Sequence, residues 1–179
     1  MEDTFLILGF KRGSTEALCR IYEKYEQTML SVAMGLLNDR GTAEDVVHDV
    51  VVALARAPEK LKLAGTLRAY LTTCVANLAR DRLRARQRAA RHVENSRPTE
   101  NSVAGPLPEI LHDEQVRRVA GALEQLPYEQ REVVVLHLRG GLPFRAIART
   151  QNISINTAQS RYRYGIDKLR AMLNGEVDK

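Results

Sequence analysis

The chain has 179 residues, a formal net charge of +5 and two cysteines, a length that suits one ordinary domain or two small ones. No apolar run approaches the roughly 20 residues that would span a bilayer, and acidic residues precede the short apolar run at the N-terminus, the reverse of a secretory signal. We therefore expect a cytoplasmic protein without membrane insertion. Cys19 and Cys74 each lie within an apolar helical pattern and have no second Cys or His at ligand spacing, which predicts buried free thiols rather than a disulfide, a metal site or a redox switch.

The positive charge is concentrated in two segments. Residues 61–93 carry eight basic side chains against one acidic side chain, and residues 131–179 carry nine against four. The segments before them, 1–60 and 94–130, are both net acidic. Two basic patches, each preceded by an acidic block, indicate two separate contacts with a polyanion.

The first two helices of the chain can be placed from apolar periodicity. Apolar residues recur at helical steps from Ser14 to Leu37, and we expect Gly41 to end this helix. Thr42 and Asp45 resemble a capping box and predict the start of the second helix. In that helix the valines between positions 46 and 51 face inward with Leu54.

The outward face of the second helix is acidic, with Glu44, Asp45, His48 and Asp49. Three interpretations remain open: an acid/base pair or metal site, a solvated face on which Asp45 acts as a cap, and a docking surface for a basic partner helix. No other candidate ligand can be placed opposite His48, so we favour a solvated or docking face over catalysis.

A long helix is expected from Thr66 onwards, and its C-terminal half is rich in arginine. Six arginines lie between Arg80 and Arg91, interrupted by a single acid, Asp81. One or two cations near a helix C-terminus are explained by the helix dipole, but six are not. This run predicts phosphate neutralisation and a strong dependence of binding on salt.

Residues 93–111 are rich in Asn, Ser, Pro and Gly and predict a flexible linker. The linker divides the chain into domains at 1–92 and 112–179 and leaves their relative arrangement open. Helical periodicity continues beyond it, and no strand pattern is convincing. We therefore expect an all-α fold of two small helical domains.

The C-terminal domain ends in a predicted helix-turn-helix, from Leu142 to Arg170. Pro143 can start the first, short helix, Asn152 tolerates the left-handed conformation of a tight turn, and Ser154 can cap the second helix. That second helix carries a complete apolar stripe, formed by Ile155, Ala158, Tyr162, Ile166, Leu169 and Leu173.

The face opposite this stripe is polar but almost free of Glu and Lys, which usually dominate a merely solvated helix face. It carries Asn156, Gln159, Ser160, Arg163 and Tyr164, flanked by Arg161 and Arg170. Gln, Asn and Arg make bidentate hydrogen bonds to base edges, and Ser or Arg bind phosphates. The pattern favours a DNA-reading helix over a solvated helical hairpin.

Taken in order, three segments resemble the two-domain, extracytoplasmic-function (ECF) group of bacterial RNA polymerase sigma factors. Residues 43–54 (AEDVVHDVVVAL) are similar to the family's helix that docks on the polymerase clamp. Residues 67–88 (LRAYLTTCVANLARDRLRARQR) resemble its minus-ten segment, and residues 123–170 resemble its minus-thirty-five domain. The ordered co-occurrence of all three is more specific than any one of them.

The resemblance implies a sigma factor that binds core RNA polymerase and promoter DNA and directs transcription initiation, with an anti-sigma factor as inhibitory partner. Its N-terminal domain would be sigma region 2 and its C-terminal domain region 4. Contact with the clamp is implied for Asp45, His48 and Asp49. Proximity to the melted minus-ten strand is implied for Asn77, Arg80, Asp81, Arg82 and Arg84. Binding of the minus-thirty-five element is implied for Asn156, Thr157, Gln159, Ser160, Arg161, Arg163 and Tyr164, of which Thr157 and Arg161 would contact phosphates.

Some positions depart from the family's pattern. His48 stands where Gln is common, Tyr70 where Trp is usual, Gln159 where a cation is common and Tyr164 where Arg is common. These departures leave the promoter sequence open.

Two other classes of protein fit the sequence less well. A stand-alone helix-turn-helix regulator of operator DNA would account for the last two helices but not for the arginine-rich helix, and no coiled-coil heptad for self-association is present. An enzyme is not expected, since the sequence has no phosphate loop, no nucleophile–His constellation and no zinc-ligand spacing. We expect no cofactor and no metal.

Overall fold

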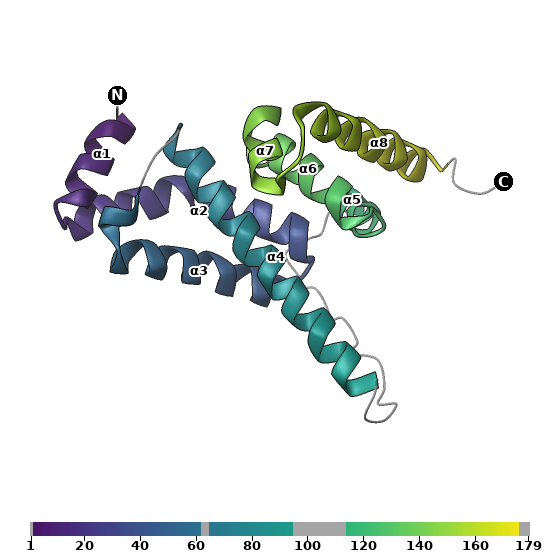
Figure 1. Ribbon diagram of the computed structural model, residues 1–179, viewed down its shortest axis with the longest axis horizontal. Coiled ribbons are helices and arrows are strands. Elements are labelled where there is room, and N and C mark those ends of the chain that lie inside the picture. Colours follow the sequence, from purple (N-terminus) through teal and green to yellow (C-terminus); the bar gives the residue numbers. More distant parts are fainter. Residues whose placement is uncertain (1, 62–64, 95–113, 176–179) are drawn as a thin grey trace.

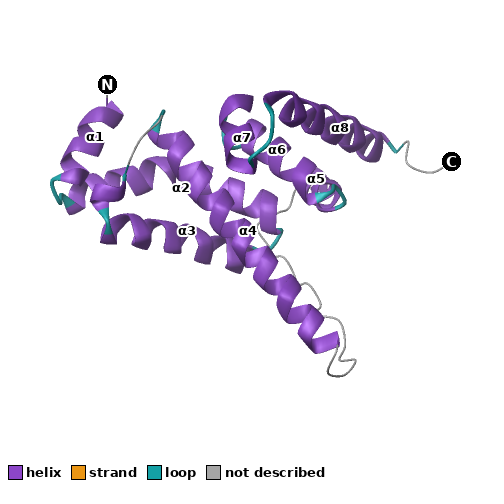
Figure 2. Cartoon of the chain, in the orientation of Figure 1, coloured by secondary structure: helices purple, strands orange, loops and turns teal. Residues whose placement is uncertain are grey.

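The computed structural model describes residues 2–61, 65–94 and 114–175, and every regular element within these ranges is helical (Figures 1 and 2). The predicted all-α fold is confirmed. The N-terminal group of helices comprises α1 (Glu2–Lys11), α2 (Thr15–Leu37), α3 (Arg40–Arg56), a 3-10 turn (Pro58–Lys60) and α4 (Leu67–Glu94). The C-terminal group comprises α5 (Glu114–Glu124), α6 (Tyr128–Leu138), α7 (Phe144–Gln151) and α8 (Ile155–Asn174).

The linker predicted at 93–111 falls largely outside the described residues, and its first two positions belong to α4. The division at 1–92 and 112–179 therefore stays a prediction. Figure 1 shows α4 as the longest element, with its C-terminal half projecting away from the other helices.

Helix α1 was not predicted from the sequence, and polar contacts bind it to α2. Asp3 accepts hydrogen bonds from the Tyr25 hydroxyl at 2.6 Å and from Lys24 Nζ at 2.8 Å, while Leu6 and Phe10 are buried. The Lys24 hydrogen bond holds the pKa of Asp3 below its ordinary value. Burial and the Asp3 contact raise the pKa of Tyr25 to about 12.

The junction between α2 and α3 differs from the prediction. Gly41 does not end α2, and Thr42 and Asp45 do not form a capping box; instead α2 ends at Asn38, which has a left-handed backbone with φ of 51°. Asp39 is the N-cap of α3 and accepts a hydrogen bond of 2.9 Å from the Thr42 backbone N–H. Asn tolerates the left-handed backbone that ends α2, and Asp caps the start of α3 with its carboxylate, so no glycine is needed here.

We expect Asp39→Ala to lower the free energy of unfolding by about 1 kcal/mol at neutral pH, the usual cost of losing an N-cap. Hydrogen bonds from Thr42 hold the pKa of Asp39 below its usual value of 3.8. A depressed carboxyl pKa gives stability that is present above the unfolded-state pKa and is lost as pH falls through the folded-state pKa. Urea unfolding of both proteins between pH 7 and pH 3 should therefore show the difference shrinking at acid pH. Asp45→Ala, in the same helix, is the control and should leave stability within about 0.5 kcal/mol of the wild type.

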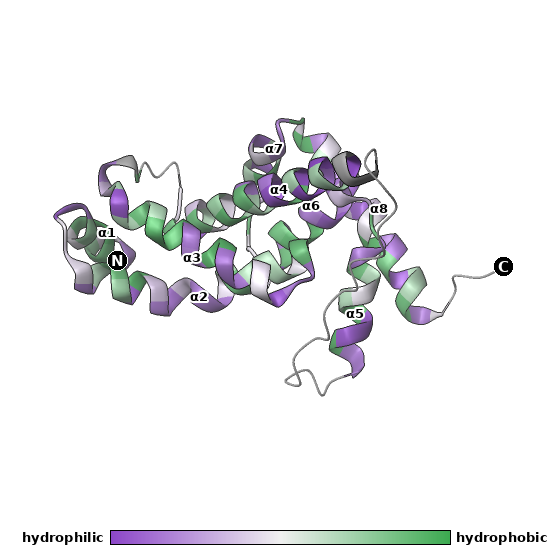
Figure 3. Ribbon diagram, turned by 90° about the horizontal axis from the view of Figure 1, so that it is seen from below, coloured by the Kyte–Doolittle hydropathy of each residue, from purple (hydrophilic) through white to green (hydrophobic). Residues whose placement is uncertain are grey.

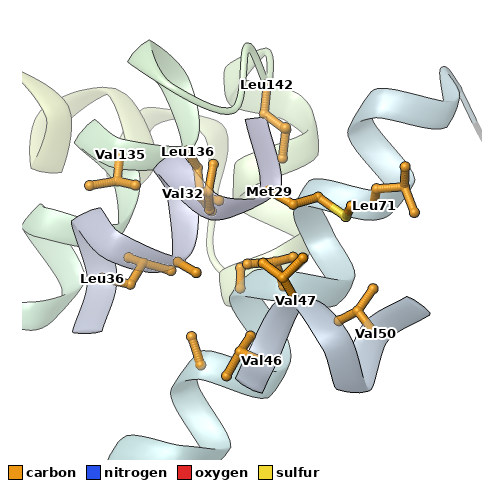
Figure 4. Packing of buried hydrophobic residues seen from close by; sticks show 14 of the residues in the cluster. Met29, Val32, Leu36, Val46, Val47, Val50, Leu71, Val135, Leu136 and Leu142 are labelled. Atoms are coloured by element: carbon orange, nitrogen blue, oxygen red, sulfur yellow. The ribbon is translucent and has the colours of Figure 1, made fainter. Parts of the chain in front are cut away.

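A single buried cluster runs through both groups of helices. Figure 4 shows its central part, which contains Met29, Val32, Leu36, Val46, Val47, Val50, Leu71, Val135, Leu136 and Leu142. Helix α2 contacts α3 and α4 and also α6 of the C-terminal group. Figure 3 shows hydrophobic and hydrophilic residues mixed along α2 and α4, as amphipathic packing requires. In α6, by contrast, four consecutive apolar residues are buried, namely Val133, Val134, Val135 and Leu136.

The cysteine prediction is half right. Both thiols are free, and Cys74 is half-buried, but Cys19 is exposed. The buried residues of α2 include Ala17 and Ile21, which are one helical turn apart. Cys19 lies midway between them in the sequence and is therefore on the opposite side of the helix. An apolar neighbourhood in the sequence was a poor guide at this position.

Candidate nucleic-acid interface

The two last helices form the predicted helix-turn-helix. Helix α7 ends at Asn152, whose φ of 55° is the left-handed conformation that the turn needs. Ser154 is the N-cap of α8, and its hydroxyl accepts a 3.0 Å hydrogen bond from the Thr157 backbone N–H. The turn is therefore built by two short polar side chains, as the sequence indicated.

The apolar side of α8 packs against α6 and α7. Ala158 and Leu169 are buried, and Tyr162 meets His137 edge-on at 4.9 Å between ring centroids. Gly165, which the sequence pattern did not single out, is buried where α8 packs against α6. A Cβ there would lie 2.9 Å from a methyl group of Val134, so the close packing requires glycine.

Ile155 does not belong to this buried side, because it is 43% exposed. As the first residue of α8, it lies at the end of the packed surface. The predicted stripe is otherwise buried or half-buried.

The opposite face of α8 is available to a ligand. Asn156, Thr157, Gln159, Arg163 and Tyr164 are exposed, and Ser160 is half-buried. The Arg163 guanidinium lies 5.6 Å from the centroid of the Tyr164 ring, and within the described part of the chain Arg163 makes no ion pair. A cation held beside an aromatic ring on an exposed helix face suits base-edge and phosphate contacts.

Arg161 is placed differently from its neighbours on α8. It is half-buried and donates a 2.8 Å hydrogen bond to Gln151 Oε1. Its guanidinium is thus engaged within the domain rather than presented on the exposed face.

The arginine-rich half of α4 is mostly exposed, and two of its arginines reach back to α3. Arg82 donates to Asp49 Oδ2 at 2.5 Å, and Arg86 lies 3.4 Å from Asp39 Oδ2. Both partners of the Arg82–Asp49 pair are 45% exposed, and exposed pairs of this kind contribute about 0–1 kcal/mol. Because these ion pairs are weak, Arg82 and Arg86 can exchange their carboxylate partners for other anions.

The other residues predicted near the minus-ten strand divide into two groups. Asn77, Asp81 and Arg84 are exposed. Arg80 is not: its side chain is only 19% exposed and forms an ion pair of 2.6 Å with Glu132 of α6. Glu132 is 2% exposed. It was not identified from the sequence, where the only indication of its burial was its position directly before the run of valines in α6.

The three residues predicted to bind the polymerase clamp share one face of α3. Asp45 and His48 are exposed, and Asp49 is half-buried beside Arg82. The spacing of three and four residues brings them onto one side of the helix. Within the described residues no three His, Cys, Asp or Glu side chains come together as a potential metal site.

No helix in the described ranges is long and apolar enough to cross a membrane. Hydrogen bonds join the two halves of the chain, from Arg80 to Glu132 and from Arg139 to the Ser31 carbonyl.

Comparison with known families identifies both halves of the chain. Residues 21–89 match Sigma-70 region 2, and residues 117–169 match Sigma-70, region 4. The first match covers α3 and most of α2 and α4, and the second covers most of the C-terminal group of helices.

Two solved structures share the fold. The sigma factor RpoE of Bartonella quintana, solved in complex with the anti-sigma factor NepR, is 21% identical with a TM-score of 0.68 over 88% of this chain and 97% of that one. CnrH, solved with the cytosolic domain of CnrY, is 24% identical with a TM-score of 0.70 over 97% of both chains.

Two relatives match over nearly the whole length of the chain. RNA polymerase sigma factor CarQ of Myxococcus xanthus is 28% identical over 171 residues, which cover 94% of this chain and 95% of CarQ. The ECF RNA polymerase sigma factor SigK of Mycolicibacterium vanbaalenii is 31% identical over 173 residues, which cover 94% of this chain and 87% of SigK. The chain therefore belongs to the ECF sigma factors of bacterial RNA polymerase.

Proposed function

We propose that this sigma factor divides promoter recognition between two surfaces, the basic half of α4 and the exposed face of α8. As a member of its family, the protein binds core RNA polymerase and directs promoter-specific transcription initiation. The observation that carries the division of labour is that the two surfaces lie on helices of different sigma regions, each with exposed arginines.

In this proposal the region 4 domain binds the minus-thirty-five duplex. Arg163, Gln159 and Asn156 would approach base edges in the major groove, because their side chains are exposed on one face of α8. Thr157, Ser160, Arg161 and Tyr164 complete the proposed surface. For Arg161 this role requires that its hydrogen bond to Gln151 be exchanged for a phosphate contact.

The region 2 domain carries the other two proposed contacts. Asp45, His48 and Asp49 on α3 would bind the polymerase clamp. The melted minus-ten strand would lie along α4, near Asn77, Arg80, Asp81, Arg82 and Arg84. An unstacked base costs a few kcal/mol to expose, and stacking and phosphate contacts offset such a cost.

We further propose that the protein acts by binding alone, in the bacterial cytoplasm, where core polymerase and the chromosome lie. The complex of RpoE with the anti-sigma factor NepR supports an anti-sigma factor as an inhibitory partner. A stand-alone regulator is not favoured, because such a protein would not explain a region 2 domain.

Promoter-dependent run-off transcription tests the proposal. Purified bacterial core polymerase is assayed with and without this protein, on DNA taken from upstream of its own gene and on a panel of promoters used by ECF sigma factors. We expect discrete transcripts that require the protein. Failure of the protein to co-elute with core polymerase, together with absence of transcripts, would contradict it.

A further inference from the structure

The region 4 helices pack directly on region 2, along a seam between α6 and α7 on one side and α2 and α4 on the other. A Cβ at Gly35 of α2 would lie 2.9 Å from a methyl group of Val135 on α6, so the two backbones approach closely. Arg139 donates to the Ser31 carbonyl at 3.0 Å, and Asn38 donates to Glu124 Oε2 at 2.7 Å. The free chain is thus held in one closed arrangement, although the sequence left the arrangement open.

The carboxylate of Glu132 lies at the centre of the polar contacts across this seam. Its Oε1 accepts from Arg80 of α4 at 2.6 Å, and its Oε2 accepts from Gln151 Nε2 at 2.7 Å. Gln151 in turn accepts from Arg161 at 2.8 Å. One buried acid therefore connects an arginine proposed to face the minus-ten strand with an arginine proposed to bind minus-thirty-five phosphates.

Arg80 makes three hydrogen bonds while the seam is closed, and both of those from Nη2 go to the C-terminal group of helices. Besides Glu132 it donates to the Thr150 carbonyl at 3.3 Å and to the Asn77 side chain at 3.3 Å. A guanidinium binds carboxylates and phosphates with the same donors. Arg80 Nη2 donates to Glu132 Oε1, so this donor is not available to a phosphate while the ion pair is intact.

We propose that Glu132 closes the free sigma factor by standing in for a DNA phosphate at Arg80, so that promoter binding requires this ion pair to break and the two domains to separate. The inference rests on the proposed role of Arg80 at the minus-ten strand. A buried ion pair of this kind contributes little net stability when intact, but removing one partner is destabilising because the other charge is left buried and unpaired. It acts as a latch that opens when another anion reaches Arg80.

The test measures domain separation in the full-length chain without polymerase. Cys19, exposed on α2, carries one fluorophore, and Lys168→Cys on the exposed side of α8 carries the other, in a Cys74→Ala background. Wild type should give one high-transfer population. Glu132→Gln removes the charge and keeps the shape, and it should raise the ratio of open to closed molecules about tenfold to a hundredfold, the range for a charge-assisted hydrogen bond.

Two further variants separate charge from packing. Glu129→Gln removes an exposed acid from the same helix and should leave transfer unchanged. Gly35→Val should open the seam by crowding Val135 without touching any proposed DNA contact. Circular dichroism of each variant verifies that the helices remain folded. Equal transfer in wild type, Glu132→Gln and Gly35→Val would overturn the proposal, and so would a wild type that is already open.

Binding to a fluorescent forked DNA at low salt, again without polymerase, tests the occlusion of Arg80. Glu132→Gln should bind about tenfold more tightly than wild type, whereas Glu132→Gln combined with Arg80→Gln should lose that gain. Opening without tighter binding would overturn the claim that Glu132 competes with DNA. If run-off transcription failed instead, the proposed function would fail while the fluorescence result still stood.

Discussion

We expect Leu136→Ala to lower the free energy of unfolding by about 2–5 kcal/mol, the range for removing a large side chain from a packed core. Leu136 is fully buried on α6 and belongs to the cluster shared with Val32 and Leu71 of the other domain (Figure 4). Its loss leaves a cavity with neighbours from α2 and α4 that are themselves fixed by packing. Urea unfolding followed by circular dichroism gives the free energy directly.

The matched control is Leu138→Ala, two residues further along α6, where the side chain is 58% exposed. Here we expect a change within about 0.5 kcal/mol, as is usual for surface positions. A similar decrease in the free energy of unfolding for both variants would show that α6 does not pack in the orientation seen in the structure.

The second large effect concerns promoter selectivity. Arg163→Ala should reduce discrimination between the cognate and a mutated minus-thirty-five element by about 1–3 kcal/mol, the value of one bidentate base contact, which corresponds to roughly 5- to 150-fold. Affinity for core polymerase should not change, because the proposed clamp contacts are on α3. Competitive run-off transcription on the paired promoters measures the first quantity, and co-elution with core enzyme measures the second.

Lys168→Ala is the control for this experiment, since it removes one positive charge from an exposed position of the same helix. It should weaken DNA binding equally on both promoters, as loss of a general electrostatic contact does. Equal loss of polymerase binding and selectivity in Arg163→Ala would defeat the division of labour between the domains.

The local chemistry of the helix-turn-helix could be predicted because its signals are short-range. Asn152 and Ser154 determine the turn through their own backbone preference and side-chain hydrogen bond. Between α2 and α3 the same reasoning was wrong. It predicted Gly41 as the end of one helix and Thr42 as the start of the next, whereas Asn38 ends α2 and Asp39 begins α3.

Contacts between residues far apart in the sequence could not be predicted from apolar periodicity. Nothing in the sequence pairs Arg80 with an acid 52 positions away, so the sequence predicted a phosphate-neutralising arginine where the structure has an ion pair with Glu132. Helix α1 was missed because its contacts, from Asp3 to Tyr25 and Lys24, depend on another helix. The DNA-reading face of α8 could be predicted from its own polar residues, whereas the clamp and minus-ten residues came from the family resemblance.

The second half of α2 has a consequence for the solubility of the protein. Val32, Ala33, Gly35, Leu36 and Leu37 are all buried, because α2 packs against its own domain and also against α6. When the seam opens, the part of this strip that faces α6 becomes wet, and contiguous apolar patches of that kind promote self-association. We therefore expect the closed arrangement to limit self-association of the free protein, because it keeps this apolar strip covered by α6.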